Sequence, residues 1–329
     1  MKRDSRLDLL RVISMAMVIV IHVANYYCRA YSDITKISYL GALIFNAISR
    51  ISVPIFFMIS GATLLHKPYD KSKNRIRIKR KVAVLFTVTI IYFLWDKYFM
   101  SKDIDVFKIL CMPERKLLWF MYAIIGIYIS LPFVKCMVDN MSREQDKLFV
   151  ILWMIFNGLL KHIGITKYYR IPLVDGTYYL GYFIIGYLII KYSKEIEEKA
   201  KNIVFIIMSS ASFTIIIVTT YFVSANNGKH FTKLFGYSNI FIILASLSVF
   251  ILIYFNADDK ENKYIAKLSQ LSFGVYLTHG IILDLLMKIF PYKNIDSFIG
   301  IPLLSFFILF FSSLIVELTK KNKLLDQYL

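Results

Sequence analysis

Long apolar segments recur along this chain of 329 residues and constrain its fold more than any other feature. A helix needs about 20 predominantly apolar residues to cross the hydrocarbon core of a bilayer. About ten segments approach that length, with short polar stretches between them. They cover residues 9–28, 39–65, 82–99, 117–137, 147–163, 177–192, 202–223, 236–255, 264–290 and 297–318. The sequence therefore predicts an all-α, polytopic transmembrane helical bundle of about ten helices.

The composition agrees with a membrane protein and excludes an ordinary soluble domain. Hydrophobic residues make up 57% of the chain, aromatic residues 16%, and the mean hydropathy is +0.58. The first apolar segment is too long for a cleavable signal peptide and is followed by no small-residue cleavage site. We therefore expect one transmembrane domain over residues 1–329, with the first segment retained as a membrane helix.

The net charge of +18 reports topology. It does not indicate nucleic-acid binding, because the sequence contains no soluble basic domain. If the N-terminus is cytoplasmic, the segments on that side hold roughly twice as many Lys and Arg as those on the other side. This bias predicts a multi-pass protein of the cell membrane with both termini in the cytoplasm. The three cysteines, Cys28, Cys111 and Cys136, form no metal-ligand or disulfide pattern, so we expect no metal.

Two ionisable residues lie within or at the edge of the first apolar segment. Arg11 and His22 are eleven residues apart, so they share one helix face and are separated by about 16 Å along the axis. Ionisable groups at such depth usually face a bundle interior or an aqueous cavity. An imidazole titrates near neutral pH, so His22, with Asn25 one turn on, is a candidate general base. Alternatively, Arg11 snorkels to the interface and His22 bonds a neighbouring carbonyl.

A second buried cation, Arg50, occurs in the second apolar segment at a depth similar to that of His22. It either pairs with a carboxylate for structural reasons or stabilises negative charge at a reacting centre. Pro54 and Gly61 follow it and permit a kink and close helix approach. Asp96, Glu114 and Asp175 are the acidic candidates for a partner of His22 on the outer side, since Asp8 lies too far down the helix.

A basic stretch precedes the third segment and holds eight cations between residues 67 and 81. A positive-inside anchor against anionic lipid explains such a stretch by itself. However, Arg77 and Arg80 share a helix face at the entry to the membrane, and guanidinium groups suit phosphate. Together with Arg11, they would meet a polyphosphate ligand arriving from the cytoplasm.

Aromatic and polar residues elsewhere are candidates for contacts with a substrate. Tyr26 lies at the predicted outer mouth of the first helix, and Trp119 opens the fourth. Tyr276 and His279 are three apart in the ninth segment and share a helix face, with Asp284 further outward. The alternatives are an aromatic belt for the tyrosines and an interhelical polar network for His279.

These motifs resemble, in order, those of the acyltransferase 3 family of integral membrane O-acyltransferases. The resemblance runs from Arg6 to His279 and the last helix. It rests on Arg11-x10-His22, Val53-Pro54-x-Phe56-Phe57-x-x-Ser60-Gly61, Arg77-x-x-Arg80, Leu118-Trp119-Phe120 and Ser272-Phe273-Gly274-x-Tyr276-Leu277-x-His279. The chain looks most similar to the membrane domain alone of bacterial cell-envelope O-acetyltransferases.

The resemblance implies transfer of an acyl group, in the first place acetyl, from cytoplasmic acetyl-CoA or another acyl-CoA to a hydroxyl of an extracytoplasmic glycan or glycan-lipid. It marks His22 as the catalytic histidine, with Arg50 beside it, and Arg11, Arg77 and Arg80 as candidates for the phosphates of coenzyme A. Tyr26, Trp119, Tyr276 and His279 are the expected substrate-binding residues. Many relatives have a histidine immediately before Leu-Trp-Phe, where this chain has Leu117.

Two other functions fit a ten-helix bundle with buried charge. One is a transporter or exporter of a small solute or polysaccharide, although we find no inverted repeat that would support it. The other is a sensor or scaffold that binds acyl-CoA without turnover. The sequence also leaves open direct transfer or a covalent acyl-histidine, and it does not indicate the acceptor or the oligomeric state.

Overall fold

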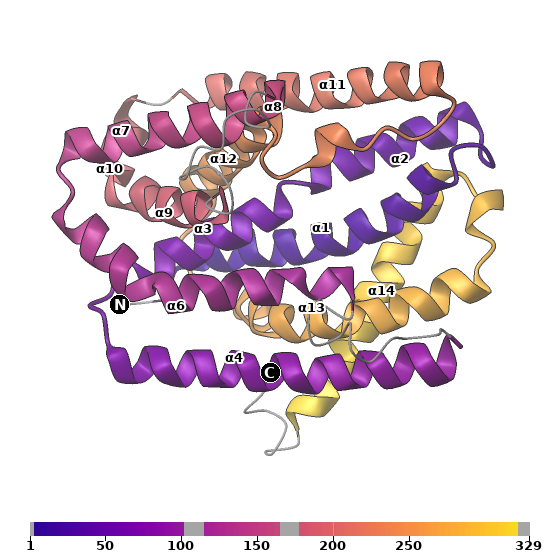
Figure 1. The fold of residues 1–329 in the computed structure, drawn as a ribbon, viewed down its shortest axis with the longest axis horizontal. Coiled ribbons are helices and arrows are strands. Elements are labelled where there is room, and N and C mark those ends of the chain that lie inside the picture. Colours follow the sequence, from indigo (N-terminus) through magenta and orange to yellow (C-terminus); the bar gives the residue numbers. More distant parts are fainter. Residues whose placement is uncertain (1–2, 102–114, 165–177, 200, 322–329) are drawn as a thin grey trace.

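The computed structural model describes residues 3–101, 115–164, 178–199 and 201–321, and over these ranges it contains helices and no strands (Figure 1). The all-α bundle predicted from the sequence is confirmed. Its helices are α1 (Ser5–Arg29), α2 (Lys36–Ser49), α3 (Ser52–Leu64), α4 (Lys71–Leu94), α6 (Trp119–Asn140), α7 (Arg143–Trp153), α8 (Lys161–Ile163), α9 (Tyr178–Lys191), α10 (Ser193–Lys199), α11 (Asn202–Asn227), α12 (Ile240–Asn256), α13 (Lys263–Ile289) and α14 (Ser297–Lys320). Short 3-10 or π segments are η1 (Trp95–Phe99), η2 (Lys116–Leu118), η3 (Met154–Leu160), η5 (Lys233–Phe235) and η6 (Tyr292–Asn294).

Eight helical stretches in the described residues are long and apolar enough to cross a membrane. They account for eight of the expected crossings. The other two expected crossings correspond to helices that are more charged or shorter. The segment 147–163 is continuous helix from α7 through η3 to α8 but carries several charges, and 177–192 falls on α9, which has only 14 residues.

The helix that follows the basic stretch begins earlier than the apolar pattern indicates. Its apolar run starts at residue 82, yet α4 starts at Lys71, so the cations up to Lys81 are helical. Asp70 explains the early start, because its side chain caps α4 by accepting a hydrogen bond from the backbone N–H of Lys73 at 3.0 Å.

The expected second crossing is divided into two helices, α2 and α3. Pro54 has no N–H, so it cannot donate to the carbonyl of Arg50, four residues earlier, and a proline ring disfavours a helix across that carbonyl. The backbone N–H of Arg50 bonds the carbonyl of Ala47, a tighter turn than in an α-helix. The interruption therefore falls at Arg50 and Ile51 and places Arg50 at a helix end inside the bundle.

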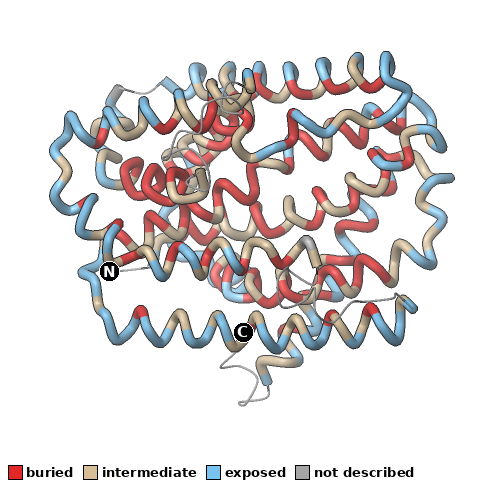
Figure 2. Tube along the Cα trace, in the orientation of Figure 1, coloured by how far each residue is buried: buried red, intermediate tan, exposed pale blue. Residues whose placement is uncertain are grey.

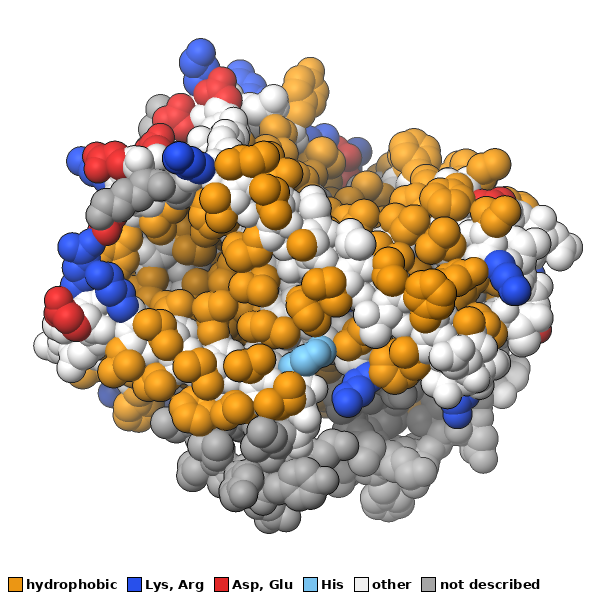
Figure 3. Space-filling model, turned by 90° about the horizontal axis from the view of Figure 1, so that it is seen from above, with side chains coloured by type: hydrophobic (Ala, Val, Ile, Leu, Met, Phe, Trp, Pro, Cys, Tyr) orange, Lys and Arg blue, Asp and Glu red, His pale blue; other side chains and the backbone are white. Residues whose placement is uncertain are grey.

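Helices α1, α3 and α9 form the centre of the bundle, whereas α4 and α11 lie along opposite edges (Figure 1). The central helices are mostly buried, and the edge helices are largely exposed (Figure 2). In a membrane protein, this exposure is expected to face lipid, and one face of the molecule is correspondingly covered by hydrophobic side chains, with most of its charges at one end and a few toward the other (Figure 3). The interior therefore lies around α1.

Both ends of the described chain lie at the same end of the bundle. Arg3 donates from Nη2 to the carbonyl of Ala266, near the start of α13, at 2.8 Å. Lys320, at the end of α14, donates to the carbonyl of Gln270 at 3.0 Å. We call this the N-terminal end. At the opposite end, Lys293 pairs with Asp33 at 2.6 Å. An even number of crossings, as the sequence predicted, places both chain ends at the same end of the bundle.

Close packing of α3 on α9 depends on two glycines. A Cβ added to Gly61 would lie 1.6 Å from the carbonyl oxygen of Phe183, and one added to Gly186 would lie 2.1 Å from that of Met58. Neither contact is possible without separating the helices, because the neighbour is backbone. Small residues let helix backbones approach in this way within membranes.

We predict that Gly61→Ala destabilises the protein, because overpacking costs about 1–3 kcal/mol or more when the neighbour cannot move. Thermal unfolding of purified protein should then shift down by several degrees. Gly126→Ala is the matched control, since a Cβ there meets nothing within 4 Å. It should leave the midpoint unchanged or slightly raised, as alanine favours helix. Equal midpoints for the two variants would contradict this account of α3 and α9.

Candidate active site

A cavity of 610 Å³ runs beside α1 in the centre of the bundle. The α1 residues that line it recur at helical spacing along one face. They are Arg11, Val18, Ile21, His22, Asn25, Tyr26 and Arg29. Arg11 and Arg29 are separated by about 27 Å along the helix, close to the thickness of a hydrocarbon core. The cavity therefore extends most of the way across the bundle, with His22 between its ends.

Three further helices supply the walls of this cavity, and the interrupted crossing places Arg50 in it. Helix α3 contributes apolar and small side chains, α6 contributes aromatic ones, and α13 contributes a mixed stripe. The lining from these and neighbouring elements includes Val53, Phe56, Ser60, Lys81, Arg115, Leu117, Trp119, Phe120, Ile124, Tyr128, Tyr237, Ser272, Phe273, Tyr276, Leu283 and Asp284. The cavity thus has cations at both ends and a largely aromatic middle.

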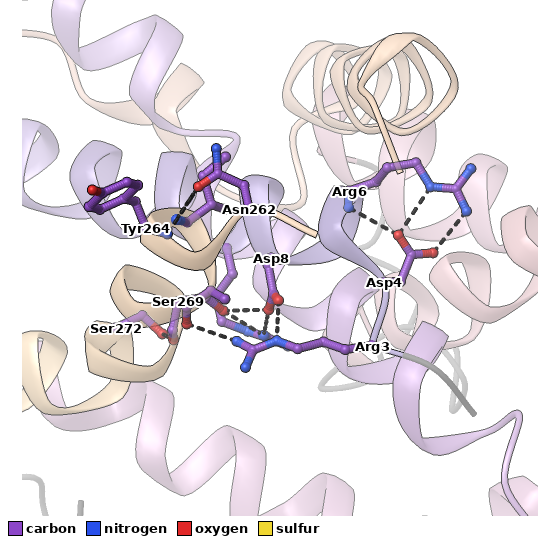
Figure 4. Close-up of polar contacts among 11 residues, drawn as sticks. Arg3, Asp4, Arg6, Asp8, Asn262, Tyr264, Ser269 and Ser272 are labelled. Carbon is purple, nitrogen blue, oxygen red and sulfur yellow. Dashed lines mark hydrogen bonds and ion pairs between the residues drawn. The ribbon is translucent and has the colours of Figure 1, made fainter. Parts of the chain in front are cut away.

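Arg11 is fixed at the N-terminal end of the cavity. Its Nη1 donates to Asp8 Oδ1 and to Ser269 Oγ, each at 2.9 Å, and Ser269 donates to the same carboxylate at 2.6 Å. Arg3 pairs with Asp8 as well (Figure 4). Two guanidinium groups therefore share one buried carboxylate. This cluster keeps a surplus positive charge, and its carboxylate is engaged about 21 Å along α1 from His22.

Lys81, which the sequence reasoning did not select, joins Arg11 at this end of the cavity. Its ammonium lies 3.0 Å from the centroid of the Phe273 ring, a cation–π contact. Arg80 is exposed and does not line the cavity. Arg77 lies elsewhere too, although it is one turn from Lys81 on α4. That i, i+4 spacing is the sequence signal that points to Lys81.

Arg77 lines a second cavity, of 770 Å³, at the N-terminal end. Four cations, Lys67, Lys73, Arg77 and Lys135, surround it with a single carboxylate, Asp70. Hydrogen bonds from the backbone of Lys73 and the hydroxyl of Ser72 lower the pKa of Asp70. Burial, with the charge of Lys135, lowers the pKa of His66, which also lines this cavity and is neutral at pH 7. The surplus positive charge suits an anion with several charges.

His22 has an imidazole neighbour, His279, from α13. Their ring centroids are 5.1 Å apart. His279 Nδ1 lies 2.7 Å from the carbonyl of Tyr276 and 3.2 Å from that of Val275. Carbonyl oxygens only accept, so Nδ1 carries the proton and Nε2 presents a lone pair. That Nε2 is buried without a hydrogen-bond partner among the described residues. His279 therefore lies behind His22 as a buried acceptor.

Arg50 is held by amides. Its Nε donates to Asn46 Oδ1 at 2.9 Å, and its Nη2 donates to Asn25 Oδ1 at 3.2 Å. The rings of Phe235 and Tyr237 lie 5.2 Å and 6.0 Å from its guanidinium carbon. Within the described part of the chain, no carboxylate pairs with Arg50. Of the two roles left open by the sequence, this environment favours a cation whose charge is available to an anion in the cavity.

The predicted aromatic residues line the middle and the opposite end of the cavity. Trp119 stacks on Tyr179, with centroids 4.9 Å apart. Tyr276 also lines it, and its hydroxyl donates to the carbonyl of Leu117 at 2.7 Å. Tyr26 packs edge-on against Tyr292 at 5.9 Å. Of the four predicted substrate-binding residues, Tyr26, Trp119 and Tyr276 therefore face the cavity, and His279 does not line it.

At the opposite end, the structure reveals a charged cluster that the sequence reasoning missed. Arg115 pairs with Asp284 at 2.6 Å and donates from Nε to Asp96 at 2.7 Å. Trp95 Nε1 donates to the same Asp284 oxygen at 3.2 Å. Asp96, a candidate partner for His22, is thus engaged by Arg115. Glu114 and Asp175, the other two candidates, lie outside the described residues.

Comparison with known proteins decides the family. A sequence profile described as an acyltransferase domain matches residues 4–319, nearly the whole chain. The chain belongs to the acyltransferase 3 family. Neither the curated proteins nor the solved structures contain a match. The acyltransferase is therefore a multi-pass membrane enzyme, as the sequence predicted. The cavity that contains His22 is the natural candidate for its active site.

The candidate site of this acyltransferase gathers most of the predicted residues. Six line one cavity, namely Arg11, His22, Tyr26, Arg50, Trp119 and Tyr276. His279 adjoins His22, whereas Arg77 and Arg80 lie apart from the cavity. The missed residues Arg115 and Asp284 gave only weak signals. Asp284 was a costly charge in an apolar segment, and Arg115 followed a polar loop.

We predict that the cavity admits a small polar thiol reagent. In a protein whose three native cysteines are replaced by alanine, Ser60→Cys, which lines the cavity, should react with a methanethiosulfonate ammonium compound. Ser246→Cys should not react, because Ser246 is fully buried on α12 and does not line the cavity. Mass spectrometry of the labelled protein gives the extent of reaction. Equal labelling at the two positions would show that the cavity does not distinguish them.

Proposed function

We propose that this acyltransferase moves an acetyl group from cytoplasmic acetyl-CoA to a hydroxyl of a cell-envelope glycan or glycan-lipid on the other side of a bacterial cytoplasmic membrane. The observation that carries the proposal is the cavity, which extends most of the way across the bundle with His22 between its ends. Donor and acceptor on opposite sides of a membrane need such a meeting place. The enzyme would bind each from its own end.

The donor enters from the N-terminal end, which the distribution of cations assigns to the cytoplasm. Its phosphates are too highly charged to enter the hydrocarbon core, so they stay where Arg77 and the other cations of the second cavity gather. Arg77 and Lys81 are one turn apart on α4, about 6 Å along the helix. The narrow pantetheine arm then passes Lys81 and Arg11 and carries the thioester toward His22.

His22 is the proposed general base. It accepts the proton of the acceptor hydroxyl as that oxygen attacks the thioester carbonyl, and the carbonyl oxygen becomes an oxyanion. Collapse of this intermediate breaks the carbon–sulfur bond, and the imidazolium returns the proton to the departing thiolate. The products are the acetyl ester and free coenzyme A. A covalent acetyl-histidine, formed and then attacked by the hydroxyl, would use the same residues.

Arg50 supplies the charge that such an intermediate needs. The two asparagines hold its guanidinium in place, and Asn25 lies one turn from His22 on α1. A cation fixed before the reaction stabilises the oxyanion without reorganising during it. Because no described carboxylate neutralises Arg50, its field remains directed at the cavity. Tyr26, Trp119 and Tyr276 offer aromatic surfaces for the acceptor.

We predict that some substitutions weaken donor binding whereas others abolish acetyl transfer without affecting binding. Arg77→Ala/Arg80→Ala should weaken binding of coenzyme A by about 10-fold or more, and Lys81→Ala should do so as well, because charge-assisted contacts are lost. His22→Ala should bind coenzyme A normally yet lose at least about 100-fold in transfer. Calorimetry across a salt series, with thiol release for turnover, measures both.

Arg75→Ala/Lys79→Ala is the matched control, because it also removes two charges from α4, at exposed positions next to Arg77 and Arg80. It should change affinity far less than Arg77→Ala/Arg80→Ala. If folded wild type fails to bind coenzyme A at all, the proposed donor is wrong. If Arg75→Ala/Lys79→Ala weakens binding as much as Arg77→Ala/Arg80→Ala, general electrostatic attraction and not the second cavity explains the loss.

We further predict that Arg50→Gln lowers kcat by about 100- to 1000-fold with little change in the KM for acetyl-CoA, because the lost interaction belongs to the transition state. Arg50→Lys keeps the charge and should recover part of the rate. Steady-state thiol release gives both constants. A rise in KM without a fall in kcat would assign Arg50 to donor binding instead.

A further inference from the structure

The charged cluster at the opposite end of the cavity contains an unused hydrogen-bond acceptor. Asp284 Oδ2 accepts a hydrogen bond from Arg115 at 2.6 Å and one from the indole N–H of Trp95 at 3.2 Å. No hydrogen bond reaches Oδ1 from the described residues, although the Asp284 side chain is only 8% exposed. Since Asp284 lines the cavity, this carboxylate is positioned to receive a donor from a molecule within it.

The cluster is built to hold Asp284 in one position. Arg115, only 10% exposed, donates to Asp96 as well as to Asp284. Trp95, in η1 at the end of α4, donates a second hydrogen bond to Asp284. Burying this many charges is costly and is not explained by stability alone. Asp96 is buried as well, but it does not line the cavity. The two carboxylates therefore share one cation but have different surroundings.

The charges at this end also indicate what kind of molecule fits. Among the described residues, the cations Arg29 and Arg115 stand against Asp284 on the lining and Asp96 behind Arg115, so the described charges of this cluster balance. An acceptor with its own charge would enter without a partner, at a desolvation cost. A neutral polyhydroxyl compound can donate a hydrogen bond from one of its hydroxyl groups to Asp284 Oδ1. Tyr26, beside it on the lining, presents an aromatic face to a sugar ring.

We propose that Asp284, held by Arg115 and Trp95, binds the acceptor as a neutral pyranose and accepts a hydrogen bond from one of its hydroxyl groups through Oδ1. Asp284 lies five residues beyond His279, the neighbour of His22, and thus about 7.5 Å further along α13. Asp284 and His22 also line the same cavity, so a sugar ring held by Asp284 lies in the cavity that contains His22. This inference rests on the proposed acetyl transfer for its biological meaning, but its binding test does not.

The test uses purified full-length protein in lipid nanodiscs and measures binding of methyl glycosides by calorimetry without any donor. The probes are the neutral methyl α-glucoside, α-galactoside and α-mannoside, with methyl α-glucuronide as the anionic and methyl α-glucosaminide as the cationic comparison. We expect at least one neutral glycoside to bind more tightly than either charged one. If no neutral glycoside binds, or if a charged one binds more tightly, the proposal is overturned.

Two variants of the same ion-pair cluster separate acceptor binding from folding. Asp284→Asn should weaken binding of the neutral glycoside by about 10- to 100-fold, because a charge-assisted hydrogen bond is lost. Asp96→Asn also removes a carboxylate from Arg115 but leaves the cavity lining intact, so its affinity should stay within about 3-fold of wild type. Equal losses in the two variants would assign the cluster a purely structural role.

A second variant and a second readout complete the design. If Asp284→Asn does not fold, Asp284→Glu keeps the charge opposite Arg115 but moves the free oxygen, and it should weaken glycoside binding too; unchanged affinity overturns the proposal. With acetyl-CoA present, Asp284→Asn should raise the acceptor KM and leave the donor KM unchanged. Glycoside binding that depends on Asp284, in a protein that does not bind coenzyme A, would support this site while refuting the proposed transfer.

Discussion

The cost of placing a charge in hydrocarbon governs this structure. A bilayer offers no water to an isolated arginine, histidine or aspartate, so each must find a partner or a hydrated cavity. Arg11 shares Asp8 with Arg3, and Arg115 shares two carboxylates. The bundle closes around these groups and leaves a cavity along α1 because they cannot be exposed to lipid.

Proline and glycine then set where the backbone permits this arrangement. Pro54 interrupts a crossing at Arg50, so the guanidinium enters the cavity from a helix end and not from the side of a continuous helix. Gly61 and Gly186 bring α9 against α3, which closes the opposite side of the core. Local backbone chemistry and the global cost of burying charge therefore act on the same few turns.

The sequence predicted the fold class and the central residues for physical reasons. Apolar length reports crossings directly, and an eleven-residue spacing fixes Arg11 and His22 on one face whatever else the chain does. The sequence showed that Pro54 permits a break at Arg50 but not that it requires one. Whether the helix breaks also depends on the groups that surround the freed carbonyl of Arg50 in the fold. The early start of α4 depended on a single capping aspartate, which hydropathy does not register.

The pairings between distant segments were beyond the sequence. Nothing local connects Arg115 with Asp284, which are joined only when α13 packs beside the start of η2. Arg77 and Lys81 share one side of α4 but line different cavities, because the neighbours of that side change from α6 residues at Arg77 to Phe273 of α13 at Lys81. Helical periodicity gives a residue's angle about its own axis, but the neighbour at that angle comes from tertiary packing.

The cations at the N-terminal end of the cavity have a consequence for the membrane itself. A polar cavity that spans most of a bilayer threatens to let protons and sodium ions leak down the membrane potential. Arg11 and Lys81 at this mouth oppose the entry of cations by electrostatic repulsion, as arginines do in channels that exclude them. The same side chains that surround the site can thus keep the membrane electrically sealed.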